Sequence, residues 1–160
     1  MEIGTGSGCI ALTLAKQLPK ASIIAVDISD KALRIARKNQ AKLKIKNVKL
    51  LKSNLLEKVK SKPNIMVANL PYLTSNELKE VSISREPRLA LYGGKNGLDT
   101  YRQLFQQIKE RGWSSIAIFL EIGSSQAREI RKIASSLFPN AEVEIKKDLA
   151  NRDRVVIIRT

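Results

Sequence analysis

The chain contains no histidine, one cysteine, few aromatic residues and no long hydrophobic run. Without histidine a Ser-His-Asp triad is impossible, and a single cysteine leaves too few ligands for a classical zinc site. One cysteine also excludes an internal disulfide and fits a reducing compartment, so a cytoplasmic location is expected. No segment approaches the ~20 apolar residues of a membrane span, and Glu2 stands where a signal peptide would be basic. Any chemistry must therefore use carboxylates, amides, hydroxyls, backbone groups or a bound cofactor.

What is present is an ordinary apolar fraction, 43% of 160 residues, which suits one domain with a sizeable core. The net charge of +14 is unevenly spread, because residues 31–62 hold twelve Lys or Arg and one acid, for a net +11. This segment can be a basic face for RNA, or for a partner that sits on RNA. Since few aromatic residues accompany the charge, a solvated helix face is the alternative.

Apolar runs alternate with amphipathic stretches along the chain. The pattern predicts helices at 9–18, 30–43, 97–111 and 124–138. It predicts strands at 22–28, 47–51, 64–69, 115–121, 141–146 and 153–159, with a tight turn between the last two. Residues 70–96 are expected to form a long loop. The alternation indicates an α/β sheet that is mostly parallel and covered on both faces, with the last two strands antiparallel at one edge.

The second helix and the strand ends carry the more specific expectations. The helix at 30–43 is expected to begin at a cap formed by Ser29 or Asp30. Its apolar stripe, at helical spacing, comprises Ala32, Leu33, Ile35, Ala36 and Leu43.

Ligands of parallel sheets bind outside the carboxyl ends of the strands. One rim should therefore collect the residues that follow Ile3, Val26, Leu51 and Ala68.

The opening stretch MEIGTGSGCIALTLA places glycines at Gly4, Gly6 and Gly8. They permit a tight turn and let a ligand touch the backbone where a helix begins. The spacing fits neither a P-loop nor the dinucleotide fingerprint. Asp27 ends the next strand, where its carboxylate can accept hydrogen bonds from both ribose hydroxyls of an adenosine. Cys9 is expected to be a small buried residue at the helix start.

A second candidate site is the corner Asn69-Leu70-Pro71-Tyr72, which ends an apolar strand. Pro71 donates no N–H to a ladder and biases Leu70 away from helix. The corner should therefore be stiff and extended, with an amide and an aromatic ring at its tip. It can be a plain loop, or it can hold one flat polar group.

The stretch from Glu2 to Gly8, together with Asp27, resembles the cofactor motif of the seven-strand methyltransferases that use S-adenosylmethionine. The corner is similar to the Asn-Pro-Pro-Tyr motif of their amino-methylating branch. Other stretches narrow the resemblance to the HemK/PrmC family: Glu86–Leu91, Gly94 with Asn96–Arg102, Leu120–Gly123 with Gln126, and Asp148 with Arg152–Val156. That family methylates a glutamine side-chain amide in peptide-chain release factors. The resemblance covers essentially all 160 residues.

The resemblance implies a Rossmann-like, class I methyltransferase sheet of seven strands and S-adenosylmethionine as the cofactor. The residues implied to bind this cofactor are Glu2, Gly4, Thr5, Gly6, Ser7, Gly8, Asp27, Ile28, Asn54, Leu55 and Asn69. The residues implied to hold the substrate amide are Asn69, Leu70, Pro71 and Tyr72. The Asn69 oxygen and the Leu70 carbonyl would accept from the two amide N–H groups, and Tyr72 would offer a flat face.

The sequence departs from the family pattern at three points. Leu70 stands where the family usually has proline, and Asn54 where an acid commonly lies near the adenine. Because Leu70 keeps its carbonyl, reduced preorganisation rather than lost function is expected. The chain begins inside strand one, so residues 1–160 are expected to be a catalytic domain with that strand truncated. The family's N-terminal helical domain, which contacts the release factor, is expected to be absent.

Three functions remain open at this point. The first is methylation of a release-factor glutamine. The second is methylation of an exocyclic amine of an RNA or DNA base, which the basic segment favours and for which Tyr72 would stack on a flipped base. The third is a cofactor-binding remnant without catalysis. The role of Glu86 and Arg88 is also open, since they can order the substrate side or tie the loop to the sheet as an ion pair.

Overall fold

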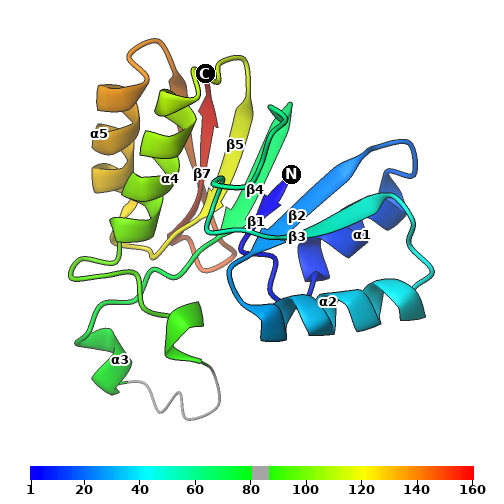
Figure 1. Ribbon diagram of the computed structural model, residues 1–160. Coiled ribbons are helices and arrows are strands. Elements are labelled where there is room, and N and C mark those ends of the chain that lie inside the picture. Colours follow the sequence, from blue (N-terminus) through cyan, green and yellow to red (C-terminus); the bar gives the residue numbers. More distant parts are fainter. Residues whose placement is uncertain (81–86) are drawn as a thin grey trace. The chain divides into compact units, whose positions relative to one another are not determined.

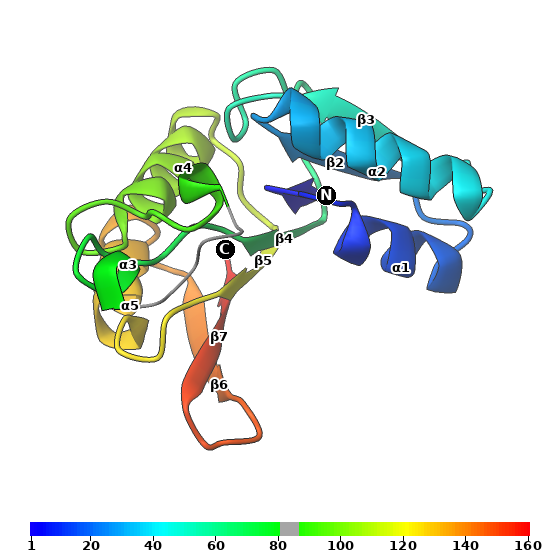
Figure 2. The same cartoon turned by 90° about the horizontal axis from the view of Figure 1, so that it is seen from below.

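The computed structural model describes residues 1–80 and 87–160, which divide into two compact units, Met1–Ala68 and Asn69–Thr160 (Figure 1). The strands that begin in the first unit are β1 (Glu2–Ile3), β2 (Ile23–Asp27), β3 (Val48–Lys52) and β4 (Ile65–Asn69). Its helices are α1 (Cys9–Gln17) and α2 (Asp30–Lys42). Figures 1 and 2 show both helices on the same face of β2 and β3. Each predicted element of this unit is therefore present, with bounds shifted by one or two residues.

The strands of the first unit pair in parallel, β3 with β2, β2 with β1, and β1 with β4. The registers align Ile3 with Val26 and with Ala68, and Val26 with Leu51. These are the four residues after which the chain was predicted to reach one rim. The prediction is confirmed, and the glycine turn and Asp27 follow at that rim.

The core of the first unit follows helical spacing only in part. Leu33 and Ala36 of α2 are fully buried, whereas Ile35 is 51% exposed and Leu43 is 52% exposed. The predicted stripe was too wide, because at ~100° per residue Ile35 lies about 200° around the helix from Leu33. The cap is Ser29, whose Oγ accepts a hydrogen bond from the Ala32 N–H at 3.3 Å.

The second unit contains strands β5 (Ala117–Glu121), β6 (Glu142–Lys147) and β7 (Asp153–Arg159). Its helices are α3 (Glu77–Glu80), α4 (Asp99–Glu110) and α5 (Ala127–Leu137), with a 3-10 helix at Arg88–Ala90. Figure 1 shows α4 and α5 side by side on one face of β5 and β7. The unbroken loop predicted over 70–96 is wrong in its described part, because α3 and the 3-10 helix interrupt it.

The predicted antiparallel pair at the end of the chain is confirmed. β7 pairs antiparallel with β6 and also with β5, and Figure 2 shows the β6–β7 hairpin in orange and red. The turn is closed by Asp148, whose carboxylate accepts from the N–H groups of Ala150 at 2.9 Å and Arg152 at 3.0 Å. Asn151 takes a positive φ of 60°, a conformation that Asn tolerates better than most residues.

The strand order is β3-β2-β1-β4-β5-β7-β6, a mixed sheet of seven strands. Parallel pairing from β3 to β4 and antiparallel pairing of β7 make this the predicted α/β class, a Rossmann-like sheet with an antiparallel edge. In the part of the chain that the structure describes, no helix has the length and apolar character needed to cross a membrane.

Candidate active site

The turn between β1 and α1 depends on its glycines. Gly4, Gly6 and Gly8 have φ angles of +71°, +56° and +83°, which side-chain-bearing residues rarely adopt. A Cβ on Gly8 would lie 3.0 Å from Leu12 Cδ1, so this glycine lets α1 pack. A Cβ on Gly6 would meet no described residue within 4 Å. The space beside the Gly6 Cα is therefore open to a ligand.

A buried carboxylate, that of Glu2, stabilises this turn by accepting hydrogen bonds from it. Glu2 is only 3% exposed, and its carboxylate accepts hydrogen bonds from the Thr5 hydroxyl and from the Ala11 N–H, the latter at 3.0 Å. Burial raises the pKa of Glu2, and the hydrogen bond from Thr5 opposes this shift. Glu2 and the buried Thr5 thus hold the shape of the turn through hydrogen bonds to Glu2 Oε2.

A second carboxylate holds the turn from the end of β2. Asp27 accepts hydrogen bonds from the N–H groups of Gly6 and Ser29, both at 2.8 Å. Ser7 is exposed, and its carbonyl accepts from the Asn39 side chain of α2 at 2.9 Å. Next to Asp27, the apolar side chain of Ile28 is 47% exposed. A carboxylate beside an exposed apolar side chain suits a ligand with both hydroxyls and a flat ring.

The residues after β3, Asn54 and Leu55, are partly engaged within the chain. The Asn54 side-chain amide donates to Glu57 Oε1 at 2.7 Å, and the Leu55 side chain is buried with a positive φ of 48°. Leu55 can therefore offer a ligand its backbone rather than its side chain. Just before them, the Ser53 N–H donates to the Asp27 carbonyl at 3.0 Å, which ties this segment to the end of β2.

Cys9 is exposed at the first position of α1, so the prediction that it is buried is wrong. The helix turns its small and apolar residues, Ala11, Leu12 and Ala15, toward the sheet. At ~100° per residue, Cys9 lies about 160° around the helix from Ala11 and about 120° from Ala15, so it falls at the margin of that face and is exposed.

The second predicted site, the corner Asn69–Tyr72, lies in the second unit. Asn69 is exposed, and no described residue hydrogen-bonds its side chain. Leu70 is buried, and its carbonyl accepts a long hydrogen bond of 3.4 Å from the Tyr101 hydroxyl. That hydroxyl makes a shorter bond of 2.6 Å to the Glu121 carbonyl, so the Leu70 oxygen keeps acceptor capacity. Burial raises the pKa of Tyr101, which keeps the phenol a neutral donor.

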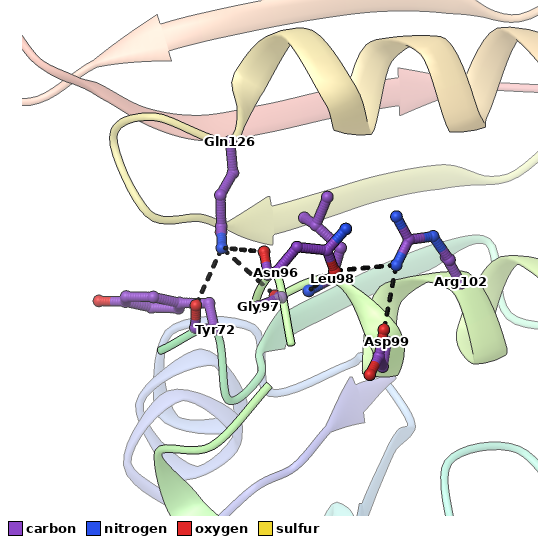
Figure 3. A network of polar contacts seen from close by, with 7 residues as sticks. All are labelled: Tyr72, Asn96, Gly97, Leu98, Asp99, Arg102 and Gln126. Atoms are coloured by element: carbon purple, nitrogen blue, oxygen red, sulfur yellow. Dashed lines mark hydrogen bonds and ion pairs between the residues drawn. The ribbon is translucent and has the colours of Figure 1, made fainter. Parts of the chain in front are cut away.

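The far end of the corner is held by Gln126 (Figure 3). This side chain is 8% exposed, and its Nε2 donates to the Tyr72 carbonyl at 2.9 Å and to the Gly97 carbonyl at 3.3 Å. Its Oε1 accepts from the Gly123 N–H at 3.0 Å. In the same view Asn96 Oδ1 accepts from the Arg102 guanidinium at 3.0 Å.

Two glycines let the chain approach the corner closely. A Cβ on Gly93 would lie 2.5 Å from the Pro71 carbonyl oxygen, and a Cβ on Gly97 would lie 2.1 Å from the Tyr72 carbonyl oxygen. Both separations are impossible for real side chains, so these positions require glycine. The Gly93 N–H also donates to the Leu73 carbonyl at 2.9 Å.

Sequence reasoning did not assign roles to Gln126 and Tyr101. Gln126 stands at the N-cap of α5, where Ser, Thr, Asn or Asp is preferred, and this mismatch was an available signal of a role elsewhere. Tyr101 gave no such signal, because it continues the apolar face of α4. Glu86 lies outside the described residues, while the Arg88 guanidinium lies 5.0 Å from the centre of the Tyr92 ring. Arg88 is thus engaged by a cation–π contact.

The fold and the glycine turn define a class I methyltransferase, and comparison with known sequences agrees. The family profile described as the methyltransferase small domain matches residues 1–86, more than half of the chain, so the chain belongs to this family. A solved ribosomal protein L11 methylase from Lactobacillus delbrueckii subsp. bulgaricus has the same fold, with a TM-score of 0.71 and 22% identity. That match covers 99% of this chain and 68% of the solved chain.

Within the family, the chain is similar to proteins named release factor glutamine methyltransferase. It is 37% identical to that of Thermodesulfovibrio yellowstonii over 163 residues, which cover 99% of this chain and 58% of the relative. It is 36% identical to that of Streptococcus pneumoniae over 161 residues, covering 99% of this chain and 57% of the relative. The predicted resemblance is confirmed, and the chain spans somewhat more than half the length of these relatives.

Proposed function

We propose that this chain is the catalytic domain, over residues 1–160, that transfers a methyl group from S-adenosylmethionine to a glutamine side-chain amide of a peptide-chain release factor. The observation that carries the proposal is the pair of acceptors where β4 ends. Asn69 is exposed, and the next carbonyl, that of Leu70, retains acceptor capacity. The names of the relatives point to the same chemistry. Release factors act in translation, so a cytoplasmic location goes with this proposal.

The glycine turn fits the cofactor. The open space beside Gly6 would admit its amino acid part, while the Asp27 carboxylate and the exposed Ile28 side chain would hold its ribose and adenine parts. Asp27 already accepts two backbone N–H groups, but a carboxylate has about four lone-pair sites, which leaves capacity for ribose hydroxyls. When bound, S-adenosylmethionine supplies an electrophilic methyl group on a sulfonium.

The residues of the corner have a positioning task. An amide nitrogen is a poor nucleophile because its lone pair is delocalised into the carbonyl. Asn69 Oδ1 and the Leu70 carbonyl would each accept one N–H of the substrate amide and so orient its nitrogen, while Tyr72 covers the planar group and excludes water. Transfer would break the methyl–sulfur bond of the sulfonium and leave a neutral thioether. The methylated nitrogen would release one proton to solvent on the exposed Asn69 side of the corner, so no strong base is needed. Alignment of this kind can supply up to ~7–11 kcal/mol of a barrier.

Calorimetric binding of S-adenosylmethionine tests the first half of the proposal. Asp27→Asn should weaken binding by about 10- to 100-fold, because hydrogen bonds to a charged group contribute ~1.5–3 kcal/mol. Asp30→Asn is the matched control, since Asp30 is exposed and paired with Lys52, and it should bind as the wild type does. Equal binding by both variants would remove Asp27 from the cofactor site.

Transfer of a labelled methyl group tests the second half. A release factor with its glutamine-bearing loop should be labelled by the wild type and not by Asn69→Ala. Labelling of RNA in place of the release factor would support a base methyltransferase, and binding of S-adenosylmethionine without transfer would identify a remnant that does not catalyse.

We also propose that the basic segment 31–62, with its net charge of +11, contacts RNA while the protein meets its substrate. The lysines and arginines of α2 that face solvent include Lys31, Arg34, Arg37, Lys38 and Lys42. Acids are scarce nearby, so this charge is poorly compensated within the chain.

A further inference from the structure

We propose that Gln126 is a positioning residue for the acceptor corner, which fixes Tyr72 and through it the orientation of the Leu70 carbonyl. This inference rests on the proposed function. Gln126 joins three segments that are distant in sequence: the corner after β4, the turn before α4 and the loop after β5. Its partners there are Tyr72, Gly97 and Gly123.

The peptide between Tyr72 and Leu73 is held at both ends. Its carbonyl accepts from Gln126 Nε2 at 2.9 Å, and its N–H, that of Leu73, donates to the Leu91 carbonyl at 2.9 Å. On the other side of Tyr72, the ring of Pro71 fixes φ. The corner is thus restrained on both sides, and Leu70 lies one residue beyond that restraint. This restraint matters more here, because Leu70 lacks the fixed φ that a proline would have.

The ring of Tyr72 is placed by the same residues, here called the Gln126 cluster: Gln126, Tyr72, Gly97 and Gly123. A Cβ on Gly123 would lie 3.4 Å from Tyr72 Cδ2 and 3.1 Å from Gln126 Oε1, so the ring and the amide both pack over this glycine. Figure 3 shows the Tyr72 side chain pointing away from Gln126, with its hydroxyl outside the network. The Gln126 amide therefore fixes the backbone of Tyr72 and leaves the ring face available to a substrate.

The cluster requires a donor at this position. The three groups that Nε2 meets are the carbonyl oxygens of Tyr72, Asn96 and Gly97, so a carboxylate in its place would set negative charge against them. Gln126→Glu has nearly the same shape, and burial among carbonyl groups should raise the pKa of its carboxyl. Protonated, that carboxyl can donate to the Tyr72 carbonyl as the amide does, whereas ionised it cannot.

The test is the ratio of kcat between Gln126→Glu and the wild type across pH 5.5–9, measured with a release factor and saturating S-adenosylmethionine. We expect the ratio to fall by roughly 10- to 100-fold as pH rises, because misplacement by about 1 Å costs ~100-fold in rate. Affinity for S-adenosylmethionine should stay within about twofold of the wild type, because the residues of the glycine turn are unchanged and sites without shared partners contribute nearly independently. A pH-independent ratio near one would overturn the inference.

Gln103→Glu is the matched control. Gln103 is exposed on α4 and should show a flat ratio across the same pH range. Equal pH dependence in both variants would mean that added charge, and not the Tyr72 contact, changes the rate, and that too would overturn the inference.

A second measurement separates this inference from the proposed function. Gln126→Leu removes the acceptor of the Gly123 N–H, so hydrogen exchange at this amide should become at least about tenfold faster, a change of ~1.4 kcal/mol in opening free energy. If the wild type methylates no release factor, the proposed function fails, and this exchange rate still decides whether Gln126 holds the cluster. Unchanged exchange at Gly123 in a folded variant would overturn the inference.

Discussion

At the residue scale, the buried carboxylate of Glu2 makes the stability of the folded protein depend on pH. Its pKa is raised mainly by burial, so the folded protein favours the neutral carboxyl. The stabilisation from this preference is fully present below the unfolded pKa of about 4.3 and is lost as pH rises through the higher folded value. Glu2→Gln keeps an oxygen that can accept from Ala11 and Thr5, and it does not ionise.

We therefore expect the stability of Glu2→Gln relative to the wild type to increase between pH 4 and pH 8. Urea unfolding at several pH values measures this difference. Glu110→Gln, at the exposed end of α4, controls for the loss of one negative charge. A difference that is independent of pH would show that the two states of Glu2 are equally favoured in the folded protein.

Residues whose roles are local could be predicted from the sequence, whereas residues with distant partners could not. Asp27 and Asn69 were singled out as candidates because each directly ends an apolar strand. Gln126 was missed because its main partner, Tyr72, lies 54 residues away in the chain. The exposure of Cys9 was also missed, since a small residue at a helix start fits either side of the helix.

At the element scale, α2 allows a direct comparison of two apolar side chains on one helix. Leu33 is fully buried and Ile35 is 51% exposed, although both were predicted to lie in one apolar stripe. Leu33→Ala should reduce the free energy of unfolding by ~2–5 kcal/mol through the cavity it leaves. Ile35→Ala should change it by less than about 1 kcal/mol. Urea denaturation measures both, and equal losses would place Ile35 in the core.

The long helices and the strands were predictable because their apolar period extends over several residues. The short α3, of four residues, has no measurable period. The sequence nevertheless indicates its start, because Thr74-Ser75-Asn76-Glu77 matches a capping box. In the structure Glu77 Oε2 accepts from the Thr74 N–H at 2.7 Å, and Thr74 Oγ1 accepts from the Glu77 N–H at 3.3 Å. Capping chemistry, rather than periodicity, was the usable signal.

At the scale of the whole molecule, the uneven charge predicts how RNA binding depends on salt. Fluorescence anisotropy with a labelled single-stranded RNA should show affinity falling by ~10³–10⁵ between 50 and 200 mM salt if 6–10 phosphates are contacted. The triple variant Lys42→Glu, Lys46→Glu, Lys49→Glu should weaken binding at least tenfold, as several phosphate contacts would be lost.

The control for this experiment lies in the second unit. The triple variant Lys95→Glu, Lys109→Glu, Lys147→Glu makes the same change in net charge at exposed lysines outside the basic segment. It should weaken RNA binding much less. A flat salt response, or equal effects of the two triple variants, would leave residues 31–62 as a solvated surface.

The strand order has a consequence for how copies of the protein meet one another. β3 and β6 stand at the two ends of that order, and an unpaired strand edge can recruit a strand from another molecule. β6 carries Glu142 and Glu144, which form ion pairs with Arg159 of β7, and β3 carries the exposed Lys49 and Lys52. A second molecule docking edge to edge would have to desolvate these charges. Charges at both edges therefore disfavour the strand-to-strand pairing of two copies from which fibres grow.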